Sequence, residues 1–249
     1  MSAVGTLPWA RRRGGRLTVR DRFLFVASAL RSRARRRREA GHPPALRVER
    51  LDLAGLRFID SALVKRTFEH AEEVYQPWLL NHCIRTYYWG GLLGQLESLN
   101  VDREELLVAS LCHDLALACE PRPGSEKECF AVRGAEMAEA LLHDHERPAL
   151  APTIAESITM HLNIAPAPVA PPYLNYLLQQ GASIDVVGWD LAKVSPRKAE
   201  VVAQYPRLDL KKHLVEVLSR EAEAHPGARL AMMVRFGFFQ FIADAPYEE

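Results

Sequence analysis

A histidine-aspartate pair, His113-Asp114, stands at the centre of the apolar stretch "ELLVASLCHDLALACEP". Leu111 and Leu115 lie close to it, and apolar residues continue in both directions. Burying an ionisable side chain is costly unless it is paired or bound to a metal, so two adjacent ones indicate a functional role. An imidazole and a carboxylate together are suited to hold a divalent cation or to transfer a proton.

A second pair, His143-Asp144, occurs in "ALLHDHERPAL", at the polar end of a predicted helix just before Pro148. A histidine in the last turn of a helix interacts favourably with the helix dipole. We therefore interpret this copy as a solvated helix terminus. The two pairs share their residue types but differ in their surroundings, and only the first is expected to be buried.

Two more residues of ligand type stand among apolar neighbours: His82 in "LLNHCIRTYYWG" and Asp185 in "GASIDVVGWD". With the pair at 113–114 they give the order His, His-Asp, Asp on three predicted helices. Two imidazoles and two carboxylates suit one divalent cation of intermediate softness and leave positions open for water. The alternatives are a bond from His82 to a backbone carbonyl and a helix N-cap at Asp185, although Ser183 suits that cap better.

His161 and Arg85 are candidates for contact with a substrate. His161 ends a predicted helix at "SITMHLN", where it either interacts with the helix dipole or carries a proton beside the metal site. Arg85 lies one turn after His82, and it either forms an ion pair with a carboxylate such as Glu97 or points at the substrate. Asp114 is a second candidate for proton transfer. The aromatic residues that follow are expected to pack in the core: Tyr87, Tyr88 and Trp89.

Helical patterns position these residues, and no segment of any length alternates with the period of a strand. Asp60 and Asp102 are the N-cap candidates of two of the predicted helices. We expect an all-α bundle of about seven or eight helices with short connections. The predicted helical segments are 60–76, 77–100, 102–118, 129–145, 151–163, 172–194 (one helix or two), 210–225 and 228–245.

The bulk composition is that of an ordinary globular protein. The chain has 249 residues, of which 48% are hydrophobic and 25% are charged, and it contains no apolar run long enough to span a membrane. None of the four cysteines forms a C-x-x-C motif, so we expect free thiols in a reducing cytoplasm and no cysteine-based zinc site. The apolar segment "ARLAMMVRFGFFQFIADA" is suited to the core or to a contact between identical subunits.

The net charge of +1 conceals an uneven distribution. Residues 1–50 contain fourteen arginines and three acidic residues, and runs of like charge are usually solvated. We therefore divide the chain into a basic N-terminal arm, residues 1–44, which is partly helical or disordered, and a main domain, residues 45–249. The arm is expected to be dispensable for folding. It either touches nucleic acid or an anionic surface, or has no dedicated ligand.

The pattern of His82, His113-Asp114 and Asp185 resembles the HD-domain superfamily of metal-dependent hydrolases. The segments "NHCIRTYYWG", "HDLALA", "CFAVRGAEMA", "IAESITMH" and "GASIDVVG" are similar, in order, to the branch that contains cyanamide hydratase. The resemblance covers roughly residues 75 to 215 and leaves out the basic arm. It implies that the four residues named first are metal ligands, and it supports a role of His161 close to the metal.

Two departures from the family pattern affect what is expected. Ala131 stands where the cyanamide hydratase branch has an acidic residue, a change that can alter which substrate binds. Two-metal members carry an extra histidine about one turn before the glycine of "CFAVRG", and here Phe130 or Ala131 stands there. We therefore expect one divalent ion, most plausibly Zn²⁺, with Fe²⁺, Mn²⁺ or Co²⁺ as alternatives. The absence of that histidine argues against a di-iron oxygenase.

The expected activity is addition of metal-activated water to a small nitrile- or amide-like substrate. The alternative within the superfamily is a phosphohydrolase that acts on a nucleotide or another phosphate monoester. Phosphates require several basic side chains or a helix N-terminus in the pocket, and the sequence supplies few near the motifs, chiefly Arg85 and Arg133. A non-enzymatic module with a structural metal is the third hypothesis.

Overall fold

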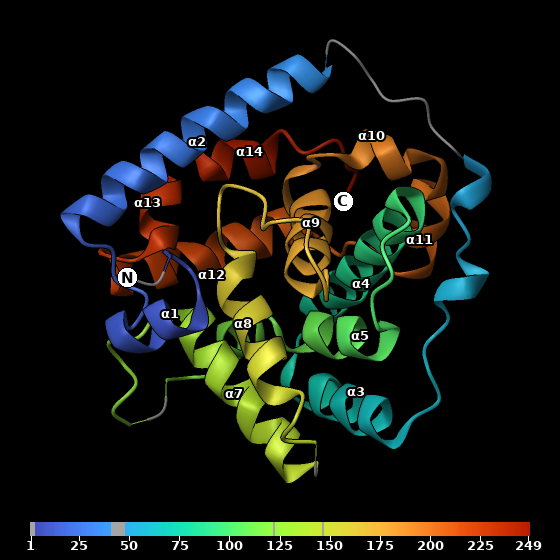
Figure 1. Cartoon of the computed structure of the whole chain (residues 1–249), viewed down its shortest axis with the longest axis horizontal. Coiled ribbons are helices and arrows are strands. Elements are labelled where there is room, and N and C mark those ends of the chain that lie inside the picture. The colour runs from blue at the N-terminus through green and yellow to red at the C-terminus, as the bar shows by residue number, and fades with distance from the viewer. Residues whose placement is uncertain (1–2, 41–47, 122, 146) are drawn as a thin grey trace.

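The predicted helical segments form helices that pack around a common core (Figure 1). A computed structural model describes residues 3–40, 48–121, 123–145 and 147–249, and these residues contain no strand. The helices are α1 (Leu7–Arg13), α2 (Val19–Ala40), α3 (Ala62–Val74), α4 (Pro77–Glu97), α5 (Arg103–Cys112), α6 (Leu115–Ala118), α7 (Phe130–Asp144), α8 (Ala151–His161), α9 (Leu174–Val187), α10 (Leu191–Val194), α11 (Lys198–Gln204), α12 (Leu210–Ala224), α13 (Arg229–Arg235) and α14 (Phe238–Ala243). Short 3₁₀ turns lie at Val48–Arg50, Ala54–Leu56 and Ser195–Arg197.

The all-α prediction is confirmed, and the long helices of the bundle follow the predicted segments. Three local details differ, of which the first is a break of the predicted segment 102–118 into α5 and α6. Ser61, and not Asp60, caps α3, because its hydroxyl accepts a hydrogen bond from the backbone N–H of Val64 at 3.1 Å. Asp102 caps α5 as expected and accepts from the N–H groups of Glu104 and Glu105. The last apolar segment is broken into α13 and α14 by Gly237, whose φ of 86° ends a helix.

Helices α4 and α9 cross closely at the centre of the molecule (Figure 1). Glycines make this approach possible: a Cβ atom on Gly90 of α4 would lie 2.7 Å from the carbonyl oxygen of Leu177 on α9. A Cβ atom on Gly181 of α9 would lie 2.3 Å from the carbonyl oxygen of Thr86 on α4. Any larger side chain would push the helices apart, so these glycines bring the polar residues of α4 and α9 within contact distance of one another.

The N-terminal segment packs on the bundle. Trp9 of α1 is 3% exposed and Phe25 of α2 is 5% exposed, and the Glu156 carboxylate on α8 accepts a hydrogen bond from the N–H of Leu7. Arg16 forms an isolated bridge with Ala228. These contacts argue against the expectation that the segment is dispensable for folding. The proposed boundary between residues 44 and 45 lies outside the described residues.

None of the helices in the described part of the chain combines the length and the apolar character that a membrane span requires.

Candidate metal centre

The His113-Asp114 pair lies at a break between two helices. Helix α5 ends at Cys112, and Asp114, with φ of −113° and ψ of 14°, leads into the short helix α6. The Nδ1 atom of His113 lies 2.7 Å from the carbonyl oxygen of Ser110, which is the geometry of an N–H donor. His113 is 1% exposed and Asp114 is 4% exposed. The break in the helix therefore holds both polar side chains inside the core.

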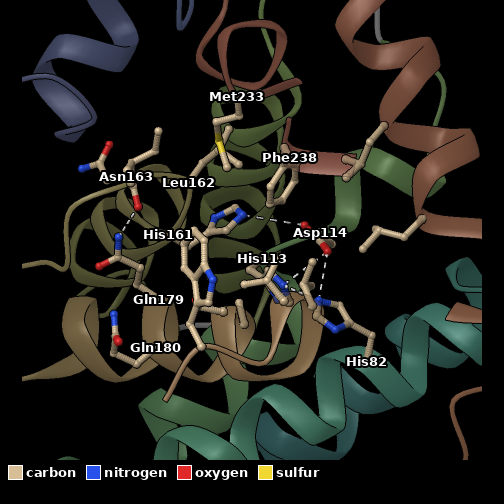
Figure 2. A pocket seen from close by; sticks show the side chains of 18 of the residues that line it. His82, His113, Asp114, His161, Leu162, Asn163, Gln179, Gln180, Met233 and Phe238 are labelled. Atoms are coloured by element: carbon tan, nitrogen blue, oxygen red, sulfur yellow. Dashed lines mark hydrogen bonds and ion pairs between the residues drawn. The ribbon is translucent and has the colours of Figure 1, made fainter. Parts of the chain in front are cut away.

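His82 of α4 joins this pair. Its Nε2 atom lies 3.2 Å from the Nε2 atom of His113 and 3.5 Å from an Asp114 carboxylate oxygen, which is itself 3.3 Å from the His113 Nε2 atom. One ligand atom from each of the three residues can be chosen so that all lie within 4.8 Å of one another. Figure 2 shows the Asp114 carboxylate between the two imidazoles on one side and His161 on the other. The structure thus brings together three of the four predicted ligands.

The donor set fits a divalent cation. The Nδ1 atoms of His82 and His113 face a carboxylate oxygen and a carbonyl oxygen, which places their protons on Nδ1 and leaves the Nε2 lone pairs directed at each other. Two lone pairs and a carboxylate oxygen at 3.2 to 3.5 Å repel one another unless a positive charge lies between them. Two imidazole nitrogens and a carboxylate are typical ligands of zinc and similar ions.

The pKa values of these groups also show that the carboxylates favour a positive charge at this position. Burial lowers the pKa of His113, but the adjacent Asp114 carboxylate outweighs burial and raises that pKa to about 10. Burial raises the pKa of Asp114, and the charge on His113 outweighs this effect, so that the pKa lies well below its usual range. For His82, hydrogen bonds to Asp114 and Asp185 outweigh burial and raise the pKa. A bound metal ion would satisfy the same negative field.

Asp185 lies next to the group of ligand atoms and not within it. One of its oxygens lies 2.8 Å from the Nδ1 atom of His82 and accepts a hydrogen bond from Arg85 at 2.9 Å. The other accepts from Arg85 at 2.7 Å and from the indole N–H of Trp89 at 2.9 Å. Both oxygens are therefore occupied, and Asp185 orients the imidazole of His82. A carboxylate behind a ligating histidine is a common outer partner of metal sites.

Arg85, a predicted substrate contact, lies instead on the far side of Asp185. Its guanidinium is fully buried, donates to the carbonyl oxygens of Tyr205 and Pro206 at 3.0 Å each, and does not line the cavity described below. Sequence reasoning missed Arg207, which donates to the Asp185 backbone carbonyl at 3.0 Å. No motif identifies Arg207, because it lies in the segment between α11 and α12, outside the apolar helical patterns that single out the other residues.

His161, at the end of α8, lies on the opposite side of Asp114. Its Nδ1 atom lies 2.5 Å from the carbonyl oxygen of Ile158, and its Nε2 atom is 3.9 Å from an Asp114 oxygen. Burial, with the charge on His113 as the next cause, lowers the pKa of His161 to about 3. The Nδ1 atom of His161 is engaged with the carbonyl oxygen of Ile158 and its Nε2 atom faces Asp114, so the imidazole stands where a proton can be transferred.

A cavity of about 90 Å³ adjoins the ligand group. His82, His113, Asp114 and His161 line one end of it, and most of the remaining wall is apolar. The polar residues of that remaining wall are Arg36, Asn163, Gln179, Gln180 and Ser183. Phe130 also lines the cavity, whereas Ala131, which replaces the acid of the cyanamide hydratase branch, is buried elsewhere in the core.

The second histidine-aspartate pair is exposed. His143 and Asp144 form the last residues of α7, and both side chains face solvent. Neither belongs to the group of close ligand atoms found among the described residues. The interpretation of this pair as a solvated helix terminus agrees with its position.

The HD domain model matches residues 79–225, more than half of the chain. The chain therefore belongs to the HD domain family, and this membership, together with the cluster of His82, His113 and Asp114, indicates a metal-dependent hydrolase. No match to a curated protein is found. The matched range contains His82, His113, Asp114, His161 and Asp185. It leaves out α1, α2, α3, α13 and α14, so Arg36 of the cavity wall lies outside it.

Proposed function

We propose that the protein adds water to a small, uncharged substrate with a nitrile- or amide-like carbon centre. One divalent ion, most plausibly zinc, would be held by His82, His113 and Asp114, with Asp185 orienting His82. When bound, the ion would supply a water of lowered pKa and polarise the substrate. The family membership and the three ligand residues support a metal-dependent hydrolase. The proposal adds the reaction and the class of substrate.

The cavity beside the donor set is the observation that carries the proposal. Its volume of about 90 Å³ has room for a molecule of a few heavy atoms and is far smaller than a typical site for a large ligand. Beyond the ligand group and His161, the lining contains one ionisable side chain, Arg36. Its guanidinium stacks 3.5 Å from the ring centre of Trp189. A phosphate monoester needs several cationic donors, which this wall does not offer.

Gln180 supplies a neutral polar contact in the cavity wall. Gln180 is 6% exposed and is one of the residues that line the cavity (Figure 2). The preceding residue, Gln179, is fully occupied. It donates to the carbonyl oxygen of Asn163 (Figure 2) and to that of Ala165, and it accepts from the N–H of Ala167. An amide in the cavity wall can pair with a substrate that offers both a donor and an acceptor, such as a carboxamide or a urea.

The side chains of the site can perform the proton transfers of the reaction. As the water oxygen forms its bond to the substrate carbon, the Nε2 atom of neutral His161 accepts a proton of that water. The resulting imidazolium returns a proton to the substrate nitrogen. In the case of a nitrile, the triple bond between carbon and nitrogen becomes a double bond. The Asp114 carboxylate, 3.9 Å from His161, stabilises the positive charge while it lasts.

The experiment is a substrate panel with the purified, metal-loaded protein. Cyanamide, simple nitriles, amides and ureas are compared with nucleoside monophosphates, each with zinc, manganese, cobalt and iron. The proposal predicts turnover of at least one small neutral substrate. Phosphate release from the monophosphates, without turnover of any small neutral compound, would instead establish the phosphohydrolase alternative.

Adjacent glutamines provide a matched pair of variants for the same panel. Gln180→Leu removes an amide from the cavity wall, so we expect kcat/KM for the neutral substrate to fall by about tenfold with an unchanged Tm. Gln179→Leu leaves backbone groups of the 163–167 loop without partners, and here the expected loss is about 1–3 kcal/mol of stability. Equal catalytic and stability effects in both variants would remove Gln180 from the binding site.

A further inference from the structure

The outward face of α2 combines an apolar strip with rows of arginine. Val19, Phe23 and Leu30 are 70%, 74% and 64% exposed. At about 100° per residue they fall within about 40° of one another around the helix, so they form one line along it. Exposed arginines flank this line on both sides: Arg22 and Arg33 on one side, and Arg20, Arg31 and Arg38 on the other.

The opposite face of α2 holds the helix on the protein. Phe25 and Ser32 are buried, and the Ser32 hydroxyl donates to the carbonyl oxygen of Ile164 at 3.4 Å. Arg36 stacks on Trp189. Figure 1 shows α2 along one edge of the molecule, over α13 and α14. Helix α2 is therefore anchored to the bundle through its inner face, and the exposed strip lies on its outer face.

An apolar groove beside α2 extends this face. Leu30 lines a groove of about 410 Å³ opposite Phe236 and Phe241, which are 52% and 40% exposed. The groove and the cavity at the metal centre share Arg36, Ile164, Trp189, Met233 and Phe238 as wall residues. The groove beside the apolar strip therefore lies next to the cavity at the metal centre.

We propose that the outward face of α2 docks the protein on an anionic membrane surface. An interfacial helix buries an apolar face at the boundary between headgroups and acyl chains, and its basic side chains contact anionic headgroups. Six exposed arginines of α2 give the required charge, and Phe23 and Leu30 give the apolar anchor. Docking of this kind is peripheral and places the mouth of the groove at the membrane.

Two other occupants fit the same face less well. The phosphates of a nucleic acid would pair with the arginines, but a charged backbone would leave the exposed Val19, Phe23 and Leu30 without an apolar partner. A second copy of the chain would cover the apolar line, but it would bring the arginine rows of two α2 helices against each other. Of these three occupants, an anionic bilayer alone offers both an apolar layer and negative charge to one helix face.

Co-sedimentation of the metal-loaded full chain with vesicles tests the proposal. Vesicles of phosphatidylcholine with phosphatidylserine are compared with vesicles of phosphatidylcholine alone. We expect binding to the anionic vesicles, weak binding to the neutral ones, and release as salt is raised. Absence of binding to the anionic vesicles overturns the proposal, and so does equal binding to both kinds.

Two double variants separate the apolar and the charged contributions. Phe23→Gln with Leu30→Gln should lower binding to anionic vesicles by tenfold or more, roughly, because both apolar anchors are lost while the charge is kept. Arg22→Gln with Arg33→Gln should lower it by about tenfold. Leu208→Gln, which changes a 45% exposed leucine outside α2, should leave binding unchanged. Metal content and Tm report the integrity of each variant.

The other occupants give distinct results. One such result is that an RNA or DNA oligonucleotide binds the protein, that vesicles do not bind it, and that Phe23→Gln with Leu30→Gln leaves oligonucleotide binding intact. In that case the face is a nucleic-acid surface and the proposal fails. If sedimentation shows a dimer that the same double variant dissociates, the face is a contact between subunits and the proposal fails. Insensitivity of vesicle binding to both double variants would also contradict it.

Discussion

Two histidine-aspartate pairs occupy the ends of helices in this chain, and their surroundings give them different chemistry. His113-Asp114 lies at the buried break between α5 and α6, where His82 and His161 approach it from α4 and α8. His143-Asp144 lies at the exposed end of α7. The comparison shows that the dipeptide acquires metal-binding character from the helices packed against it, because water screens the exposed pair and leaves it without convergent partners.

Removal of the buried pair should have the largest effect. His113→Ala combined with Asp114→Ala leaves a single imidazole in place of three ligands, so we expect loss of both bound metal and activity. Metal analysis by mass spectrometry and a turnover assay measure the two effects. A double variant that still carries stoichiometric metal would contradict the assignment of the site.

Replacement of His161 should separate metal binding from catalysis. His161→Asn removes the neutral imidazole that faces Asp114 but none of the three ligand atoms. We expect the metal content to remain unchanged and kcat to fall by about 10²- to 10⁴-fold, the usual contribution of a general acid-base group. A loss of metal equal to that of the His113 variant would make His161 a ligand.

Asp185→Asn should have a smaller effect on the metal. The variant keeps the shape of the side chain but weakens the bond that orients His82, so metal affinity should fall by about 10- to 100-fold while saturating metal restores full occupancy. The free energy of unfolding should also fall, because the buried charges of Arg85 and Arg207 lose a partner. Failure to bind metal at any concentration would show that Asp185 is itself a ligand.

The exposed pair should be nearly neutral to substitution. His143→Ala with Asp144→Ala changes two solvated side chains, so metal content and turnover should match those of the unmodified protein, with stability within about 0.5 kcal/mol. Thermal unfolding and metal analysis, run beside the buried double variant, give the control. A marked loss of metal here would erase the difference between the two pairs.

The sequence predicted the residue types of the site better than their contacts. The buried pair, His82 and His161 stood out because each is a polar residue within an apolar helical pattern. The position of Asp185 depends on the close crossing of α4 and α9 at two glycines, which no local pattern reveals. The same crossing directs Trp89, expected to be plain core, at the Asp185 carboxylate.

The N-terminal segment shows how composition can mislead. The density of arginine predicted a solvated arm, and the outward residues of α2 fit that description. However, Trp9 and Phe25 are buried against the bundle, and Arg36 contributes to the cavity wall. Charge runs indicate which face of a helix meets water, but they do not indicate whether the opposite face is packed.

Anomalous diffraction from crystals of the zinc-loaded protein tests the central claim most directly. We expect one peak per chain, at about 2.0–2.2 Å from the Nε2 atoms of His82 and His113 and from an Asp114 oxygen, with Asp185 behind His82 and outside ligand distance. A chain without a peak at this position, or a pair of peaks that requires further ligands, would contradict the account of a single metal ion held by the buried histidine-aspartate pair.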